Sequence, residues 1–277
     1  MVKSLSVHTN PGQLAALTQL NRTNNILQAT QLRVTSGLKI NNPQDDSSGF
    51  QISSRLRGDI AGTSAVKTAL NLGSTTVNIA ISGGKNIKDL TIEMKGKVIQ
   101  ANQAGLDSAS RTALHNDFIA LRDQINTIAL TAEFNANNII KSGATALAIL
   151  SSQDGSTISV TVQELTSTAL AINASNLTTS ASAAAARTAI DSAIVLVGNK
   201  LAALGASAKS LEVQTDFTSE TIDNLKIALG SIIDADLADQ PCLFAHPLVN
   251  DMTLGISWAD LMRFFAHTGH DPRLLIF

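Results

Sequence analysis

Four side chains near the C-terminus have the types and spacing of a metal site. Cys242 and His246 follow a Cys-x3-His pattern, and His267 and His270 follow a His-x2-His pattern. Thiolate and imidazole ligands in such a set hold Zn²⁺ tetrahedrally. However, this segment carries most of the histidines of the chain and its single cysteine, so the spacings arise readily by chance. We therefore expect no metal site and no cofactor.

Two further motifs resemble chemical sites only in part. Gly84-Lys85-Asn86 lacks both the glycine five residues before Gly84 and the hydroxyl residue after the lysine that a phosphate-binding loop requires. Asp45 and Asp46 form a carboxylate pair, but adjacent acidic residues followed by serines are more typical of a helix N-cap than of an acid–base pair. The sequence therefore predicts no catalytic residue, and the protein is not expected to be an enzyme.

The composition excludes several classes of binding protein. Charged residues make up 15% of the chain and the net charge is −2, so the basic patch of a nucleic-acid binder is missing. Aromatic residues make up only 3%, which is few for stacking on sugars or single-stranded bases. No run approaches the roughly 18 apolar residues of a membrane span, and the N-terminus lacks the apolar core of a cleaved signal peptide. We expect neither nucleic-acid binding nor membrane insertion.

The elements that position the remaining residues are long helices. The chain has no proline between residues 44 and 240, so no helix is interrupted there by a missing amide donor. Between 190 and 232, residues at alternating steps of four and three are apolar except Thr215 and Thr218. Such a row, which we call an apolar seam, is typical of coiled-coil packing and predicts a helix roughly 65 Å long.

Three weaker seams precede this one. Residues 52–98 carry a seam with several glycines and threonines, and residues 114–132 carry a shorter one, for which Asp107 or Ser108 is a plausible N-cap. Residues 17–38 carry a fourth seam that includes the amides of Asn24 and Gln31. A helix with such a seam is marginal when isolated.

The middle and the end of the chain have other patterns. Apolar and hydroxyl residues alternate after the turn dipeptide Asp154-Gly155, and we interpret residues 145–172 as a small β-hairpin region. Residues 173–189 are interpreted as a surface linker or the start of the last helix. Residues 241–277 show no such seam and contain three of the five prolines, and within them residues 254–266 are expected to form at most a short helix.

Three motifs resemble those of bacterial flagellins. Residues 33–49 read Arg-Val-Thr-Ser-Gly-Leu-Lys-Ile-Asn-Asn-Pro-Gln-Asp-Asp-Ser-Ser-Gly, which closely resembles the N-terminal signature of that family. Residues 116–125, with Glu133-Phe134-Asn135, look like its third-helix region and the terminating Phe-Asn. Residues 233–238 look like the C-terminal Val-Asp-Ala-Asp-Leu-Ala of short, alphaproteobacterial-type flagellins.

This resemblance implies a mainly α fold, an elongated rod of long antiparallel coiled-coil helices with a small β-hairpin region. It implies an N-terminal D0-like helix over residues 1–43 and a D1-like helical rod over residues 44–236. Residues 237–277 form an atypical tail in place of the D0 C-terminal helix. The implied function is that of a structural subunit of the flagellar filament, which leaves the cell by type III export and polymerises through its terminal helices.

The resemblance also implies partners and an assembly seam. The partners are other copies of the chain, a flagellar export chaperone and hook-associated proteins. We expect the assembly seam to consist of apolar residues from both ends of the chain, namely Leu17, Leu20, Leu27, Val34, Leu38, Leu201, Leu204, Leu211, Ile222, Leu225 and Leu229.

After residue 240 the chain departs from the family pattern. A flagellin continues there with an amphipathic helix, whereas Pro241 and Pro247 would interrupt one here. Two alternatives follow from the shared architecture and the unusual tail. One is a hook–filament junction protein, and the other is a cell-surface flagellin homologue acting as a receptor or adhesin for extracellular polysaccharide.

Overall fold

The computed structural model describes residues 10–235, 243–245 and 254–256. The chain divides into two compact units, of which the larger consists of residues 59–224. The other combines residues 1–58 with residues 225–277. Two long helices continue from one unit into the other, and the domain boundaries expected from the sequence stay a prediction.

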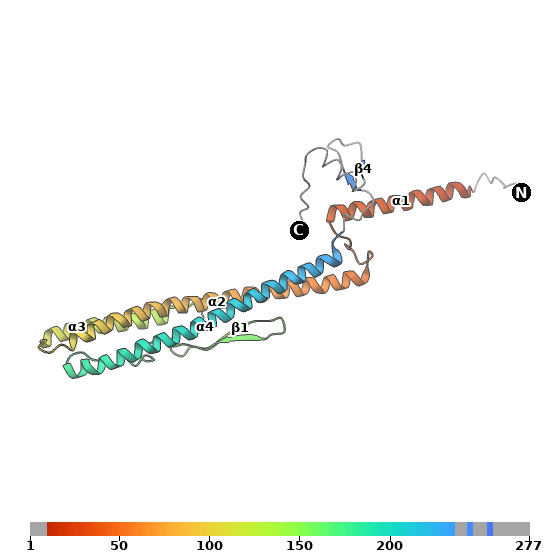
Figure 1. Cartoon of the computed structure of the whole chain (residues 1–277). Helices are drawn as coiled ribbons and strands as arrows, with labels where there is room; N and C mark the ends of the chain where they lie inside the picture. The colour runs from red at the N-terminus through yellow and green to blue at the C-terminus, as the bar shows by residue number, and fades with distance from the viewer. Residues whose placement is uncertain (1–9, 236–242, 246–253, 257–277) are drawn as a thin grey trace. The chain divides into compact units, whose positions relative to one another are not determined.

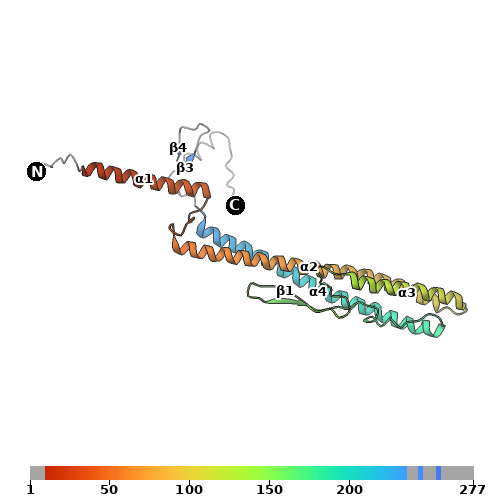
Figure 2. The ribbon, with the colours of Figure 1, turned by 180° about the vertical axis from the view of Figure 1, so that it is seen from behind.

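Three long helices build the larger unit. They are α2 (Ser47–Ala101), α3 (Ser108–Thr131) and α4 (Ser180–Ile233). In Figures 1 and 2, α3 and α4 lie alongside α2 and run in the opposite direction. Ion pairs of 2.7 Å join Lys95 of α2 to Asp191 of α4, and Lys97 of α2 to Asp117 of α3. The predicted mainly helical fold with long antiparallel helices is confirmed.

The core of this unit follows the apolar seams. Along α2 the residues that are less than 3% exposed lie three, four or seven positions apart, which corresponds to a period of 3.5 residues. A row of buried residues on α4 packs against them in the same core. The core residues of the two rows are Val66, Leu70, Val77, Ala80, Ile87, Met94, Val98, Ile190, Val197, Leu204 and Leu211. The seam predicted from residue 52 starts later, because the side chain of Ile52 is 51% exposed.

Threonines occupy seam positions without leaving a polar group unpaired. The hydroxyl of Thr91, a fully buried residue, donates to the carbonyl of Ile87 at 2.7 Å. The hydroxyl of Thr218 donates to the carbonyl of Gln214 at the same distance. Each helix therefore satisfies its own buried hydroxyls, and the apolar remainder of the threonine packs in the seam.

Glycines in the α2 seam make room for neighbouring elements, and this predicts opposite effects for two substitutions. A Cβ on Gly73 would lie 2.7 Å from Cγ1 and 3.0 Å from Cγ2 of Ile149, a nearly buried side chain. We expect Gly73→Ala to lower the free energy of unfolding by about 1–3 kcal/mol through overpacking. Gly96→Ala is the control, since nothing lies within 4 Å of its Cβ position, and it should raise stability by about 0.5–1 kcal/mol. Urea unfolding of the two variants checks both signs.

Polar side chains cap the end of α2 and the start of α3. Asp107 is the N-cap of α3 and accepts from the backbone N–H of Ser110 at 2.9 Å, which confirms one of the two predicted caps. Hydrogen bonds from the Ser110 hydroxyl and N–H lower the pKa of the Asp107 carboxyl. The guanidinium of the buried Arg111 donates to the carbonyls of Ala101 and Gln103, and the bond to Gln103 is 2.8 Å long. These bonds satisfy carbonyls at the end of α2.

The hairpin is shorter than predicted. Strands β1 (Leu147–Leu150) and β2 (Thr157–Val160) pair antiparallel around Gly155, whose φ of 87° suits a turn glycine. Residues 161–179 form no strand and pack irregularly on the helices. Of the two interpretations of residues 173–189, the start of the last helix is confirmed from Ser180 onward, where α4 begins. Residues 173–179 precede the helix, and Leu177 among them is fully buried rather than on the surface.

The described part of the tail contains two short strands. β3 (Leu243–Ala245) pairs antiparallel with β4 (Leu254–Ile256). The short helix expected over residues 254–266 is therefore wrong for its first three residues, and the others lie outside the described residues.

Helix α4 is apolar on more than its packed face. Its most apolar 18-residue stretch has a mean hydropathy of 1.4, so by length and composition alone it could cross a membrane. Only 22% of that stretch is buried within the protein. Apolar side chains therefore line the outer surface of α4 as well as its seam.

Candidate assembly surfaces

The N-terminal segment meets the end of α4. The backbone N–H of Lys39 donates to the carbonyl of Ile233 at 2.6 Å, and the N–H of Ala235 donates to the carbonyl of Gly37 at 2.9 Å. Leu38 and Asp234 form an antiparallel bridge between these bonds. The segment that follows α1 and the end of α4 therefore lie side by side within the smaller unit.

The carboxylate pair caps and shapes the turn before α2. Asp46 accepts from the backbone N–H groups of Ser48 and Gly49, both at 3.0 Å, which confirms the predicted N-cap. Asp45 accepts from the N–H groups of Asn42 and Asn41, and these bonds lower the pKa of its carboxyl. Both carboxylates are thus used as hydrogen-bond acceptors for the backbone, as expected from the sequence.

Helix α1 (Pro11–Ser36) is well capped but uncovered. Asn10 accepts from the backbone N–H of Gly12 and Gln13, Pro11 occupies the first turn, and Gly37 ends the helix in the left-handed conformation with φ of 70°. No residue of α1 is buried. The apolar side chains of this helix therefore remain in contact with water, which is unfavourable.

The expected assembly seam divides into two groups in the structure. On α1, Leu17 and Leu20 are each 56% exposed and Val34 is exposed, while Leu27 and the following Leu38 are half-buried. On α4 the side chains pack into the chain itself: Leu204, Leu211 and Ile222 are buried, and Leu201, Leu225 and Leu229 are half-buried. The exposed group is the one that the chain itself leaves uncovered, and its role in assembly stays a prediction.

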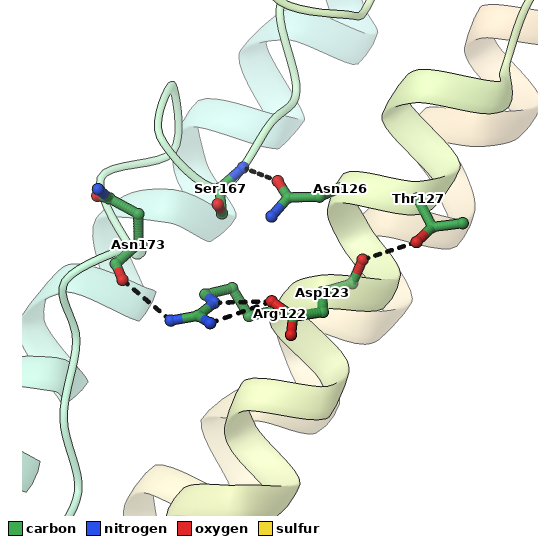
Figure 3. Close-up of polar contacts among 6 residues, drawn as sticks. All are labelled: Arg122, Asp123, Asn126, Thr127, Ser167 and Asn173. Carbon is green, nitrogen blue, oxygen red and sulfur yellow. Dashed lines mark hydrogen bonds and ion pairs between the residues drawn. The ribbon is translucent and has the colours of Figure 1, made fainter.

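A polar network fixes the irregular segment 161–179 to α3 (Figure 3). Arg122 donates to the carbonyl of Asn173 at 3.1 Å and to a carboxylate oxygen of Asp123 at 3.0 Å. The side-chain oxygen of Asn126 accepts from the backbone N–H of Ser167 at 2.9 Å. Arg122 and Asp123 belong to the flagellin-like motif 116–125, so this motif has a structural role.

The motif after α3 shapes a turn. Asn135 and Ala136 have φ of 49° and 62°, and Phe134 pairs with Asn137. The buried side chain of Asn138 donates to the carbonyl of Ala129 at 2.8 Å and accepts from two backbone N–H groups. The sequence analysis did not identify Asn138, whose importance depends on this burial.

No reactive cluster accompanies these surfaces in the described part of the chain. Residues 10–235 and the two tail strands contain no group of three or more His, Cys, Asp or Glu side chains that could hold a metal ion. Cys242, His246, His267 and His270 lie outside the described residues. The described residues thus combine long packed helices with exposed apolar side chains on α1.

Comparison with known proteins identifies the family. Residues 7–145 match the family described as the bacterial flagellin N-terminal helical region. The chain is 37% identical over 236 residues to flagellin FljM of Caulobacter vibrioides, covering 85% of this chain and 86% of the relative. It is 27% identical over 245 residues to a flagellin of Brucella melitensis. The chain belongs to the bacterial flagellin family.

A solved structure shows the same fold. It is described as a putative flagellar hook-associated protein from Vibrio parahaemolyticus, with a TM-score of 0.58 and 14% identity. The match covers 69% of this chain and all of that chain. As a flagellin, the protein is a non-enzymatic structural subunit of the extracellular flagellar filament, which serves motility.

Proposed function

We propose that the subunit joins the filament through the exposed assembly-seam residues of α1. The observation that carries this proposal is a capped helix of 26 residues with no buried residue. Nothing in the described part of the chain covers Leu17 and Leu20, although burying each leucine side chain is worth about 1.5–3 kcal/mol. Packing of α1 against terminal helices in the polymer would bury this face.

The experiment places charge on the seam of α1. Leu17→Asp with Leu20→Asp is compared with Gln19→Asp, which adds charge on the opposite side of the same helix. Because residues 241–277 contain three prolines, assembly is measured in a chain whose tail is replaced by a family-type amphipathic helix. We expect filaments in electron micrographs from the Gln19 variant and none from the double leucine variant. Normal filaments from the double variant would contradict the proposal.

Further partners of the subunit are proposed from its family alone, because no contact within the chain points to them. We propose that a flagellar export chaperone and hook-associated proteins bind the subunit before and after assembly. Binding of extracellular polysaccharide stays a hypothesis from the sequence, and glycan binding by the purified protein is its measurement.

A further inference from the structure

The hairpin turn contains the dipeptide Asp154-Gly155, whose two residues can react with each other. It is the single Asp-Gly pair of the sequence, which has no Asn-Gly pair. In such a pair, attack of the glycine nitrogen on the side-chain carbon of the acid closes a five-membered ring, and the two groups are already neighbours. Glycine hinders this approach least, because it has no Cβ.

The turn leaves these two residues at an open tip. Asp154 and Gly155 are exposed, and a Cβ on Gly155 would meet no atom within 4 Å. The N–H of Gly155 donates to the carbonyl of Ser152 at 3.4 Å, which is longer than a usual amide hydrogen bond, so the nitrogen is restrained only weakly. Among the described residues, no hydrogen bond or ion pair involves the carboxylate of Asp154. The carboxyl group and the nitrogen are therefore free to approach each other.

The residues on both sides of the tip are fixed. The backbone N–H of Ser151 donates to the carbonyl of Ser156 at 2.8 Å and closes the turn. The side chain of Gln153 donates to the carbonyl of Asp59 in α2 at 2.6 Å. Gln214 of α4 donates to the carbonyl of Ser151 at 3.1 Å. The turn is thus held to both helices at its base, so a covalent change at the tip leaves the helices packed.

The aspartates that precede a serine are held in place by comparison. They are Asp46, Asp107 and Asp191. Asp46 and Asp107 accept backbone N–H groups at the starts of α2 and α3, and Asp191 pairs with Lys95 at 2.7 Å. Each of these carboxylates would have to leave its partner before it could turn to the next backbone nitrogen. The structure therefore distinguishes Asp154 from them.

We propose that Asp154 is a site of spontaneous covalent modification, at which the subunit isomerises its own backbone to an isoaspartyl linkage. The nitrogen of Gly155 forms a bond to Cγ of the neutral carboxyl group, and the N–H proton and the carboxyl hydroxyl leave as water. This step gives a succinimide ring. Water then adds at the former main-chain carbonyl of Asp154, and the bond from that carbonyl to nitrogen breaks. The chain then runs through Cγ, with a free α-carboxylate and no change of mass.

The new α-carboxylate defines the class of enzyme that would recognise it. An isoaspartyl α-carboxylate accepts a methyl group from S-adenosylmethionine in the presence of a carboxyl methyltransferase. Because residue 154 lies at the exposed tip of a turn, such an enzyme can reach it in the folded subunit. A recess of about 320 Å³, bordered by Asp154 and Phe217, leaves space beside the carboxylate. The proposal concerns the turn alone and does not depend on how α1 assembles.

The experiment ages the full-length chain at neutral pH and follows the isoaspartate that forms. It is measured by transfer of labelled methyl groups from S-adenosylmethionine, with a purified isoaspartyl methyltransferase as the probe, and is located by electron-transfer mass spectrometry. We expect isoaspartate to accumulate at residue 154 at least about ten-fold faster than at Asp46, Asp107 and Asp191 together. Asp154→Glu is the matched control, because its side chain would have to close a larger ring, and it should lose nearly all methyl acceptance.

A second measurement tests whether the site is reached in the folded protein. Aged chain should accept the same amount of methyl, within about two-fold, in its native state and after unfolding in urea. Its helical circular dichroism should equal that of the fresh chain. No accumulation at residue 154, isoaspartate spread evenly over several aspartates, loss of helix as isoaspartate forms, or methyl acceptance only after unfolding would each overturn the proposal.

Discussion

Replacement of Leu204 by aspartate is expected to destabilise the larger unit by more than about 3 kcal/mol or to unfold it. Leu204 is fully buried in the middle of the α4 seam. The substitution removes most of a leucine side chain from the core and places a carboxylate there without a partner. The measurement is thermal and urea unfolding followed by circular dichroism at 222 nm.

Ala202→Asp is the matched control, because Ala202 is an exposed residue of the same helix two positions earlier. It should change stability by no more than about 0.5–1 kcal/mol. If Leu204→Asp melted within a degree or two of the parent, the assigned register of the seam would be wrong.

Exchange of residues 241–277 for a family-type amphipathic helix is expected to convert a chain that does not grow filaments by itself into one that does. In its own tail, Pro241 and Pro247 would interrupt a helix continuing from α4, and the described tail residues form strands β3 and β4 instead. The exposed leucines of α1 then lack a helix against which they could be buried.

The measurement is electron microscopy after seeding and after precipitant-induced assembly. The parent chain should give no ordered filaments and the exchanged chain should give them. A chain that carries the new tail with its apolar residues changed to serine is the control, since it adds equal length without an apolar face. Ordered filaments from the parent chain alone would refute the expectation.

The long helices could be predicted from the sequence because their seams repeat over many turns. The period fixed which face of α4 is buried, and Leu204 and Leu211 lie on it as expected. The α2 seam looked weaker because Gly73 and Thr91 interrupt it. In the structure Gly73 receives Ile149 and Thr91 bonds to its own helix, so these residues fit the packing rather than disturb it.

The irregular segments could not be predicted in this way. Residues 161–179 have no period, and their position depends on single contacts such as Arg122 with the carbonyl of Asn173 and Asn126 with Ser167. The apolar character of Leu177 alone does not show that it is buried. Likewise the 61% exposure of Phe217 depends on which elements cover its side of α4, and the sequence alone does not show this.

The backbone bridge between Leu38 and Asp234 has a mechanical consequence. A force applied to the segment that follows α1 passes directly to the end of α4 through the hydrogen bonds of Lys39 and Ala235, as well as along the covalent chain into α2. The two longest helices of the subunit therefore share tension and torque at their common end. In a filament that rotates to drive motility, these two backbone hydrogen bonds would couple the two helices mechanically, in addition to the packing of their side chains.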